Sequence, residues 1–263
     1  MSDFPWLRSS LLIDAGFPVH GFTMREGPGV SEGAFSSWNF STSTGDSNEN
    51  VESNYQNLCD SIGIKRESLF SVHQVHSAQL VWVQTGEFAT SSTRADGLLA
   101  TKQGAVVAVK TADCVPVLLA DPVSGSVASI HAGWRGVVGG IAEQTLAWML
   151  KQEPKAKPVI AIGPHISADH FQVGPEVAEQ FPNHHKEDPS EEGKFLVDLA
   201  SDLKERLTKA GAEPERIDVL GHCTLTDPEE RFFSHRRYKG DTGRMLNFIQ
   251  CPVRASSDET QSD

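Results

Sequence analysis

Short strand-like runs are the feature that most constrains how this chain can fold. Runs rich in Val, Ile, Leu and Ala lie at 80–83, 105–109, 115–119, 127–130, 159–162 and 217–220. Such runs, bounded by Gly, Pro, Asp and Ser, are typical of buried strands. A turn signal from Asp121 to Gly125 separates two of them. We therefore expect 115–119 and 127–130 to form an antiparallel hairpin.

Segments with helical periodicity lie between these strands at irregular intervals along the chain. A helical pattern follows Gly133, with apolar residues at spacings of three and four, and a second amphipathic pattern covers 196–210. Its apolar stripe consists of Leu199, Leu203 and Leu207. Because strands cluster instead of alternating regularly with helices, we predict an α+β (mixed α/β) fold. Its expected form is a layered sandwich of mixed β-sheets flanked by helices, in preference to a regular doubly wound sheet.

The length sets the expected domain organisation. With 263 residues, the chain matches one large α/β domain and can bury a core without disulfides. We predict a single catalytic domain over 1–254 and a disordered acidic tail over 255–263. Residues 27–50 are rich in Gly, Ser, Thr and Asn and are expected to form a long loop within that domain. Long ordered loops are often functional.

Charge and composition indicate which classes of binding partner are disfavoured. The chain has 35 acidic and 23 basic residues, a net charge of −12, which argues against nucleic acid and against anionic membrane surfaces. No signal sequence and no apolar stretch of ~20 residues is apparent. Four scattered cysteines without a CxxC pair are expected to be reduced; they are Cys59, Cys114, Cys223 and Cys251. We expect a cytoplasmic protein, monomeric or weakly dimeric, that binds small molecules.

Cys114 and His131 flank the expected hairpin at nearly equal distances from its tip, so the hairpin brings them together. With His76, they form a thiolate and two imidazoles that suit tetrahedral Zn²⁺ with an open fourth position. Such an ion lowers the pKa of bound water towards ~7. Two other interpretations stay open here: a Cys–His hydrolase with Cys114 as nucleophile and His131 as base, or a buried thiol near two unrelated histidines.

Further polar residues adjoin this group. The glycine-rich turn from Gly133 to Gly136 opens a helix, and Arg135 within it can bind a phosphate or carboxylate, or form a surface salt bridge. Asp113 can act as a general base, orient a metal ligand, or cap a turn. A second polar cluster at 232–244 is a source of anion contacts or a solvated basic strand.

Several of these motifs carry a family resemblance. They are Thr111-Ala112-Asp113-Cys114-Val115-Pro116, His131-Ala132-Gly133-Trp134-Arg135-Gly136, Gln74-Val75-His76-Ser77, Ala95-Asp96-Gly97, Phe233-Ser234-His235-Arg236-Arg237 and Thr242-Gly243-Arg244. The sequence resembles the family once labelled multicopper polyphenol oxidases (laccase-domain proteins). Members are now described as purine nucleoside phosphorylases, and some as peptidoglycan editing factors. The resemblance covers nearly the whole chain in order.

The resemblance implies a single zinc ion held by His76, Cys114 and His131. It also implies phosphorolysis of adenosine, inosine, guanosine or methylthioadenosine, together with deamination of adenosine. The implied fold is related to the catalytic domain of cytotoxic necrotizing factor toxins. The chain departs from the family where Cys, Glu, Tyr and Arg are usual; the residues here are His165, Gln172, His235 and Tyr55.

The main functional prediction is a zinc-dependent purine nucleoside phosphorylase with adenosine deaminase activity. Phosphorolysis needs a positive cradle for phosphate, for which Arg25, Arg135 and Arg237 are the candidates. Asn39 and Gln74 are further candidates for binding substrate or phosphate. Known zinc deaminases use Glu in an H-x-E motif, which is absent beside these histidines, so Asp113 is the substitute considered for proton transfer.

Three alternatives accompany it. The same zinc site, or the Cys114 thiolate, suits an amidase-like hydrolase that edits peptidoglycan precursors. A copper-loaded polyphenol oxidase is a conceivable side activity, because copper outranks zinc in intrinsic affinity. A true multicopper oxidase is disfavoured because the ten histidines include no H-x-H pair. A non-enzymatic purine-binding module is disfavoured because a pocket needs no thiolate between two histidines.

Overall fold

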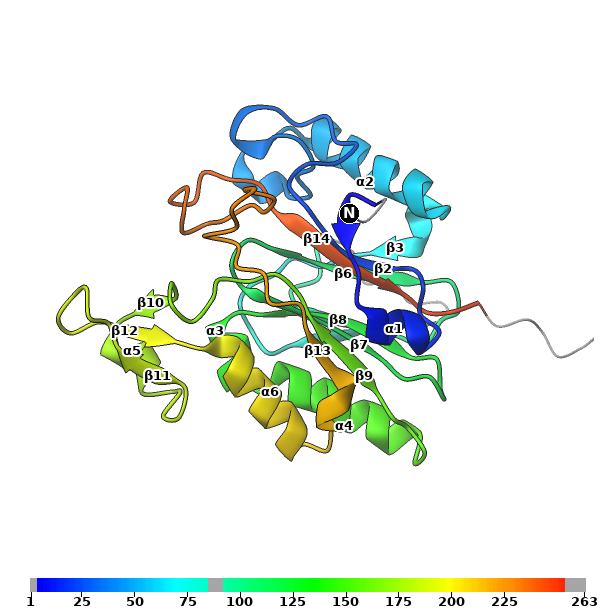
Figure 1. Cartoon of the computed structure of the whole chain (residues 1–263). Coiled ribbons are helices and arrows are strands. Elements are labelled where there is room, and N and C mark those ends of the chain that lie inside the picture. The colour runs from blue at the N-terminus through cyan, green and yellow to red at the C-terminus, as the bar shows by residue number, and fades with distance from the viewer. Residues whose placement is uncertain (1–3, 85–91, 254–263) are drawn as a thin grey trace, which may run out of the picture.

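The computed structural model describes residues 4–84 and 92–253. Two mixed β-sheets lie face to face, and helices cover their outer faces (Figure 1). The layers run from α2 (Asn48–Ile62) through a five-stranded and a six-stranded sheet to α4 (Ile141–Gln152) and α6 (Leu199–Lys209). This arrangement confirms the prediction of mixed, layered α and β structure. The predicted tail, 255–263, lies outside the described residues.

The five-stranded sheet brings the N-terminal and C-terminal strands together. In order, it contains β1 (Trp6–Leu7), β2 (His20–Thr23), β14 (Met245–Gln250), β6 (Val106–Thr111) and β3 (Leu69–Phe70). Its pairs are antiparallel except for β3 and β6. A chain segment close to the C-terminus therefore occupies the centre of the sheet, with β6 beside it.

The six-stranded sheet contains the expected hairpin. In order, it consists of β13 (Ile217–Val219), β9 (Val159–Ile162), β7 (Val115–Ala120), β8 (Val127–Ala132), β5 (Gly97–Ala100) and β4 (Leu80–Val83). β7 and β8 are antiparallel neighbours, as predicted, whereas β13–β9 and β4–β5 are parallel. Every strand-like run found in the sequence forms a strand in one of the two large sheets.

A small antiparallel sheet projects from this core. It contains β10 (Gln172–Val173), β12 (Phe195–Val197) and β11 (His185–Glu187), and α5 (Pro175–Ala178) packs beside β12. The remaining α-helices in the described part of the chain are α1 (Ser10–Asp14) and α3 (Trp134–Val138). Short 3₁₀ helices cover Gly33–Phe35, Thr42–Thr44, Arg66–Ser68 and Pro214–Arg216.

The period-two alternation of strand residues builds the layers. On β7, Val117 and Leu119 pack towards α4 and α6, whereas Leu118 faces the space between the two sheets. On β6, Val107 and Val109 face the same inter-sheet core, and alternate residues face α2. Burying one such side chain fully contributes ~1.5–3 kcal/mol, so this alternation fixes the strand register.

Two predicted helices have different bounds. The pattern after Gly133 is split into α3 and α4, because Gly140 has a φ of +71° and caps the start of α4 in a left-handed conformation. The pattern at 196–210 begins as β12, and α6 starts only at Leu199, where the Asp198 side chain accepts a hydrogen bond from the N–H of Ser201. The 27–50 segment is largely loop, as predicted.

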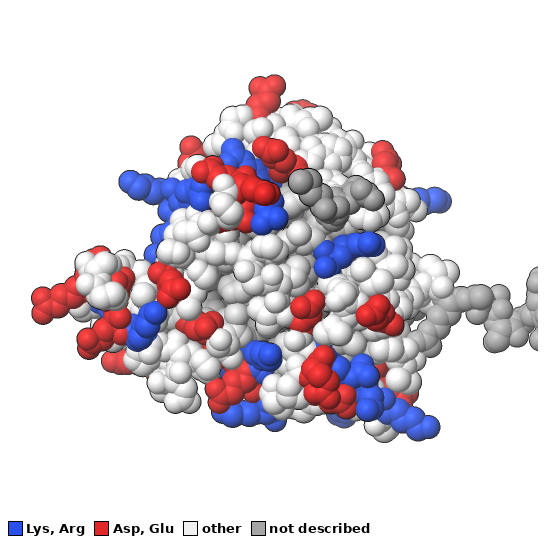
Figure 2. Space-filling view, viewed as in Figure 1, with Lys and Arg blue, Asp and Glu red and all other residues white. Residues whose placement is uncertain are grey.

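Charged side chains are scattered over the surface of the two large sheets and their helices, whereas acidic side chains gather on the small sheet. In Figure 2 acidic residues crowd the lobe at the left of the view, which Figure 1 identifies as the β10–β12–β11 sheet. Glu187, Glu191 and Glu192 are exposed there. Asp227, in contrast, is buried and pairs with Arg231. All four cysteines are free, and no helix in the described part is long and apolar enough to cross a membrane.

Candidate metal centre and its cavity

The β7–β8 hairpin brings Cys114 and His131 together. Pro116 lies opposite His131 in the strand register, so Cys114, just before β7, lies beside the end of β8. The carboxylate of Asp121 fixes the turn at the other end by accepting a hydrogen bond of 2.8 Å from the N–H of Ser124. The sequence therefore places a thiol and an imidazole at one end of the sheet through the hairpin alone.

His76 reaches the same place from the loop before β4. Its φ of +57° lies in the left-handed region that non-glycine residues rarely adopt. The carboxylate of Asp96 stabilises this conformation by accepting hydrogen bonds from the N–H groups of His76 and Ser77, at 3.0 and 2.6 Å. It also accepts one from the Ser77 hydroxyl at 2.7 Å. A single buried carboxylate thus shapes the loop that presents His76.

Asp96 also orients His131. The Asp96 side chain is fully buried, and its Oδ1 lies 2.8 Å from Nδ1 of His131. Burial by itself raises the pKa of Asp96, but hydrogen bonds from His131 and Ser77 lower it to about 2. An ionised carboxylate on Nδ1 leaves Nε2 free to bind a metal, which is the usual arrangement behind a ligating histidine.

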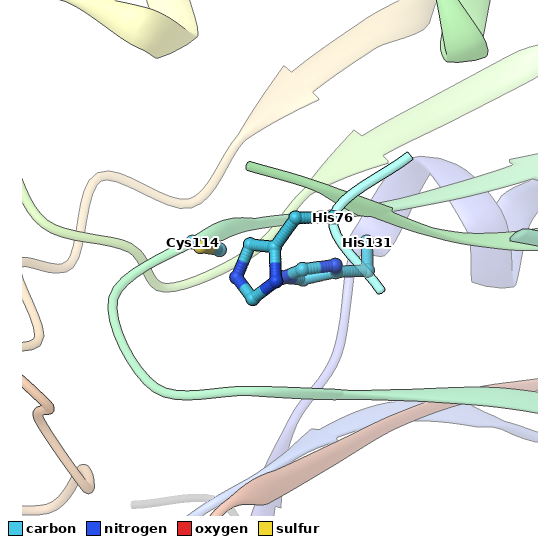
Figure 3. Close-up of side chains that lie close together, drawn as sticks. All are labelled: His76, Cys114 and His131. Carbon is cyan, nitrogen blue, oxygen red and sulfur yellow. The ribbon is translucent and has the colours of Figure 1, made fainter. Parts of the chain in front are cut away.

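The three side chains form a potential metal site. Their ligand atoms lie within 4.8 Å of one another, close to the spacing of ligands around one tetrahedral ion with bonds of ~2.0–2.3 Å. Figure 3 shows them converging from three separate segments. The ring centroids of His76 and His131 are 4.8 Å apart, and the ring planes make an angle of 80°. A Cβ at Gly133 would lie 3.2 Å from the His76 ring and 3.3 Å from Sγ of Cys114. Glycine there preserves the space between the ligands.

Cys114 and His131 also interact electrostatically. Burial by itself raises the pKa of the Cys114 thiol, but the neighbouring His131 lowers it to about 6. Burial by itself lowers the pKa of His131, but Cys114 and Asp96 raise it to about 9. The thiol is therefore readily available as a thiolate, the form that both a metal ligand and a nucleophile require.

Asp113 ties this site to later parts of the chain. Its φ is +87°, and its two carboxylate oxygens accept hydrogen bonds from the Thr224 hydroxyl and the N–H of Arg236, both at 2.6 Å. These bonds fix the turn that leads into Cys114. Asp113 also lines the cavity beside the metal site, which agrees with its predicted place near Cys114.

The metal site opens into a cavity of about 780 Å³. This volume falls within the ~300–1,000 Å³ range of small-molecule sites. The metal end is lined by His76, Ala112, Asp113, Cys114 and His131, with Ile166, Phe171, His235, Arg236 and Arg244 contributed by later segments. The remaining wall comes from Phe40–Ser43, α2, 71–74 and the end of β6, and includes Tyr55, Arg66 and Lys110. The cavity therefore extends from the metal site towards the five-stranded sheet and α2.

The predicted residues Gln74 and Asn39 shape the cavity in different ways. Gln74 lines it, and its side-chain amide exchanges two hydrogen bonds of 2.7 Å with the backbone of Lys110. Asn39 is fully buried and is not among the lining residues. Its Oδ1 accepts a hydrogen bond of 2.9 Å from the N–H of Arg244. Asn39 therefore positions a residue of the cavity wall without forming part of that wall.

The three arginines predicted to form a phosphate cradle are not among the lining residues. Arg25 donates a hydrogen bond of 3.0 Å to the hydroxyl of Tyr238. Arg135 is exposed, and its guanidinium lies 4.3 Å from the ring centroid of Trp134. Arg237 is held by a backbone carbonyl and a surface glutamate. Each guanidinium therefore has a local partner, and their binding of phosphate stays a prediction.

Other cations line the cavity instead. Arg66 is paired with Glu52, whereas Lys110, Arg236 and Arg244 form no ion pair within the described residues. Arg236 and Arg244 belong to the polar cluster at 232–244, which was predicted as a source of anion contacts. Lys110 was not predicted, and Asp96 was given no role. Two sequence features could have indicated them. Lys110 is a lysine on an otherwise apolar strand, and Asp96 is an aspartate directly before a buried strand.

Comparison with known proteins identifies the family. Residues 19–252 match the family model described as multi-copper polyphenol oxidoreductase laccase. The chain belongs to this family. The purine nucleoside phosphorylase YlmD of Geobacillus stearothermophilus is 34% identical over 260 residues, which cover 93% of each chain. A protein named adenosine deaminase RL5, from an unknown prokaryotic organism, is 32% identical and covers 88% of this chain and 93% of its own length.

A solved structure shows the same fold. The crystal structure of YlmD from Geobacillus stearothermophilus has a TM-score of 0.86 against this chain, with 30% sequence identity, and the match covers 96% of this chain and 98% of that one. The resemblance noted in the sequence is thereby confirmed at the level of family and fold.

Proposed function

We propose that this chain is a zinc-dependent purine nucleoside phosphorylase that also deaminates adenosine. Its substrates are a purine nucleoside (adenosine, inosine, guanosine or methylthioadenosine) and inorganic phosphate. One observation carries the proposal: His76, Cys114 and His131 converge at one end of a cavity whose walls also carry cations without counterions. The names of the phosphorylase and deaminase relatives support both activities.

Zinc fits this donor set best. A thiolate with two imidazoles is a common zinc combination, and three protein ligands leave a position open towards the cavity. Copper can also bind such soft ligands opportunistically, so weak polyphenol oxidation is a conceivable side activity of copper-loaded protein. Zn²⁺ bound there supplies Lewis-acid chemistry. Asp96 contributes by holding His131 in the ligating orientation and by fixing the loop of His76.

The cavity wall fits a nucleoside and an anion together. Phe40, Tyr55 and Phe171 supply aromatic surface for a purine, and hydroxyl groups of residues 41–43 lie in the same wall for the ribose. The cations that form no ion pair within the described residues lower the free energy of phosphate inside a protein whose net charge is −12. In deamination, Asp113 remains the proposed proton carrier; its two carboxylate oxygens accept hydrogen bonds from the Thr224 hydroxyl and the N–H of Arg236.

A second candidate function rests on Cys114 itself. Its thiol lines the cavity beside His131, which is the pairing of a cysteine nucleophile with its base. This arrangement suits an amidase-like hydrolase acting on peptidoglycan precursors. A Cys114→Ser variant distinguishes the two roles. If it still binds metal but loses activity, the thiol acts as a nucleophile, whereas joint loss of metal and activity indicates a ligand.

The experiment that tests the main proposal uses adenosine as substrate. Zinc-loaded protein is incubated with adenosine in the presence and absence of phosphate, and the products are separated by chromatography. We expect adenine only when phosphate is present and inosine in both reactions. If neither product forms, the phosphorylase and deaminase proposal is wrong, and hydrolysis of a cell-wall precursor becomes the function to test.

A further inference from the structure

Lys110 occupies a position where the strand pattern calls for an apolar residue. On β6, Val106 and Ala108 are fully buried and pack, with Leu246 and Phe248 of β14, in the core beneath α2. Lys110 is the next residue of the same alternation, at the end of β6 that lines the cavity. It therefore places a positive charge where an aliphatic side chain would extend the core.

The ammonium group of Lys110 is only partly satisfied within the protein. Its Nζ donates a hydrogen bond of 3.1 Å to the carbonyl of Val72, and no carboxylate in the described part of the chain forms an ion pair with it. An ammonium has three hydrogens, so two remain for a ligand. Burial lowers the pKa of Lys110 to about 8, which leaves it mostly protonated at neutral pH.

The other unpaired cations of the cavity are already engaged. Arg236 is exposed and donates its side-chain hydrogen bonds to the carbonyls of His170 and Gln172. Arg244 donates to two neighbouring carbonyls, and the negative charges of Cys114 and Asp113 act on it. Lys110 has less compensation, because its ammonium makes one hydrogen bond, to the carbonyl of Val72, and no ion pair within the described residues.

We propose that Lys110 binds the phosphate that attacks the nucleoside, and this inference rests on the proposed phosphorylase function. A dianion replaces the water that an ammonium loses on burial, whereas a neutral purine or ribose does not compensate its charge. Ser71 and Lys110 both line the cavity, and Ser71 adjoins Val72 in the chain, so a hydroxyl donor is available nearby. Lys110 thereby adds a positive charge apart from the metal ligands.

The reaction step defines what Lys110 does. A phosphate oxygen forms a bond to C1′ of the ribose, the C1′–N9 bond breaks, and its electron pair leaves with the purine. The proton of HPO₄²⁻ ends on the purine, and ribose 1-phosphate is the other product. Lys110 holds the phosphate during this exchange. Deamination uses water and no phosphate, so it does not need Lys110.

Kinetics of the two activities test this role. In Lys110→Met, which keeps the length of the side chain without its charge, we expect the KM for phosphate in phosphorolysis to rise at least about tenfold, because a charge-assisted contact is lost. We expect kcat/KM for adenosine deamination without phosphate to stay within about twofold. Lys110→Arg restores a cation and is expected to restore most of the phosphate affinity. Lys204→Met, at an exposed lysine of α6, is the matched control.

Two kinetic results would overturn the proposal. One is a KM for phosphate within about twofold of the wild-type value in Lys110→Met. The other is an equal loss of phosphorolysis and deamination in both Lys110 variants while the protein remains folded. If Lys110→Met does not fold, Lys110→Arg and the binding measurement below carry the test.

A binding measurement separates this proposal from the proposed function. Inorganic phosphate is expected to raise the Tm of the zinc-loaded wild type, and not that of Lys110→Met. If the wild type shows this shift without any phosphorolysis, the function is wrong and the anion site stands. If phosphate causes no shift in the wild type, the anion site is wrong. A Lys110-dependent shift with adenosine 5′-monophosphate alone would also overturn the assignment to free phosphate.

Discussion

Two parts of the cavity wall are built in opposite ways. At the metal site, His131 and Asp96 are buried, and hydrogen bonds hold both the ring of His131 and the loop of His76. In the other part, Lys110 makes a single side-chain hydrogen bond and has no counterion within the described residues. The metal site is preorganised by its own contacts, whereas Lys110 carries a positive charge that no carboxylate of the described chain balances.

The largest expected effect comes from removing a ligand of the proposed metal site. His131→Ala is expected to remove tightly bound zinc and to lower both activities by at least ~10³-fold, because a lost Lewis acid raises the barrier by several kcal/mol. Metal content and both rates are the measurements. His184→Gln, which removes a histidine paired with Glu205 outside the cavity, is the control. Activity of His131→Ala within tenfold of wild type would contradict the metal site.

A smaller effect is expected from the residue behind the ligands. Asp96→Asn is expected to weaken zinc binding by ~10–100-fold, the usual cost of changing the partner of a ligating histidine. A chelator competition measures this affinity, and exposed Asp169→Asn is the matched control. Saturating zinc should leave the ratio of adenine to inosine unchanged. Unchanged zinc affinity would show that Asp96 shapes the loop without tuning the metal site.

Lys110 should make the free energy of unfolding depend on pH. Burial lowers the pKa of Lys110 from 10.5 to about 8, so between these values the unfolded chain binds more protons than the folded one. The free energy of unfolding of the wild type should therefore rise with pH, relative to Lys110→Met, between pH 8 and 10.5. Paired denaturant titrations measure the difference. A difference that stays constant over this range would show that Lys110 is not destabilising.

The smallest effect is expected outside the cavity. Arg135→Gln should leave the KM for phosphate within about twofold of wild type, since Arg135 is exposed and contacts Trp134 instead of the cavity. Measured beside Lys110→Met, it compares an arginine chosen from the sequence with a lysine found in the structure. A tenfold rise in the KM for phosphate in Arg135→Gln would instead support the prediction that Arg135 binds phosphate.

Much of the fold could be predicted from the sequence because its central strands are short and fully buried. Runs such as 115–119 and 127–130 are apolar on both faces, since one face meets helices and the other meets the second sheet. Helix bounds were harder to predict. Gly140 divides one apolar pattern, and the apolar residues of β12 continue the pattern of α6 without a visible break. The expected relation to toxin domains and the oligomeric state stay predictions.

Spacing alone predicted the candidate site where the hairpin brings residues together, and the family resemblance supplied His76. The hairpin joins Cys114 and His131, so spacing alone indicated their proximity. Asp96 contacts residues about 20 and 35 positions away, which no local pattern reveals. Lys110 was missed because the strand-like run was taken to end at 109, although β6 continues to Thr111. The sequence also does not show which arginines are held by neighbouring side chains and which are free to bind phosphate.

Zinc titration of the metal-free protein tests the central claim most directly. Apo protein prepared with a chelator is titrated with Zn²⁺, and adenine and inosine formation from adenosine are followed at saturating phosphate. The account predicts that both activities are negligible without metal and rise together to a plateau at one equivalent of zinc. Full activity of either kind in the metal-free protein would contradict it.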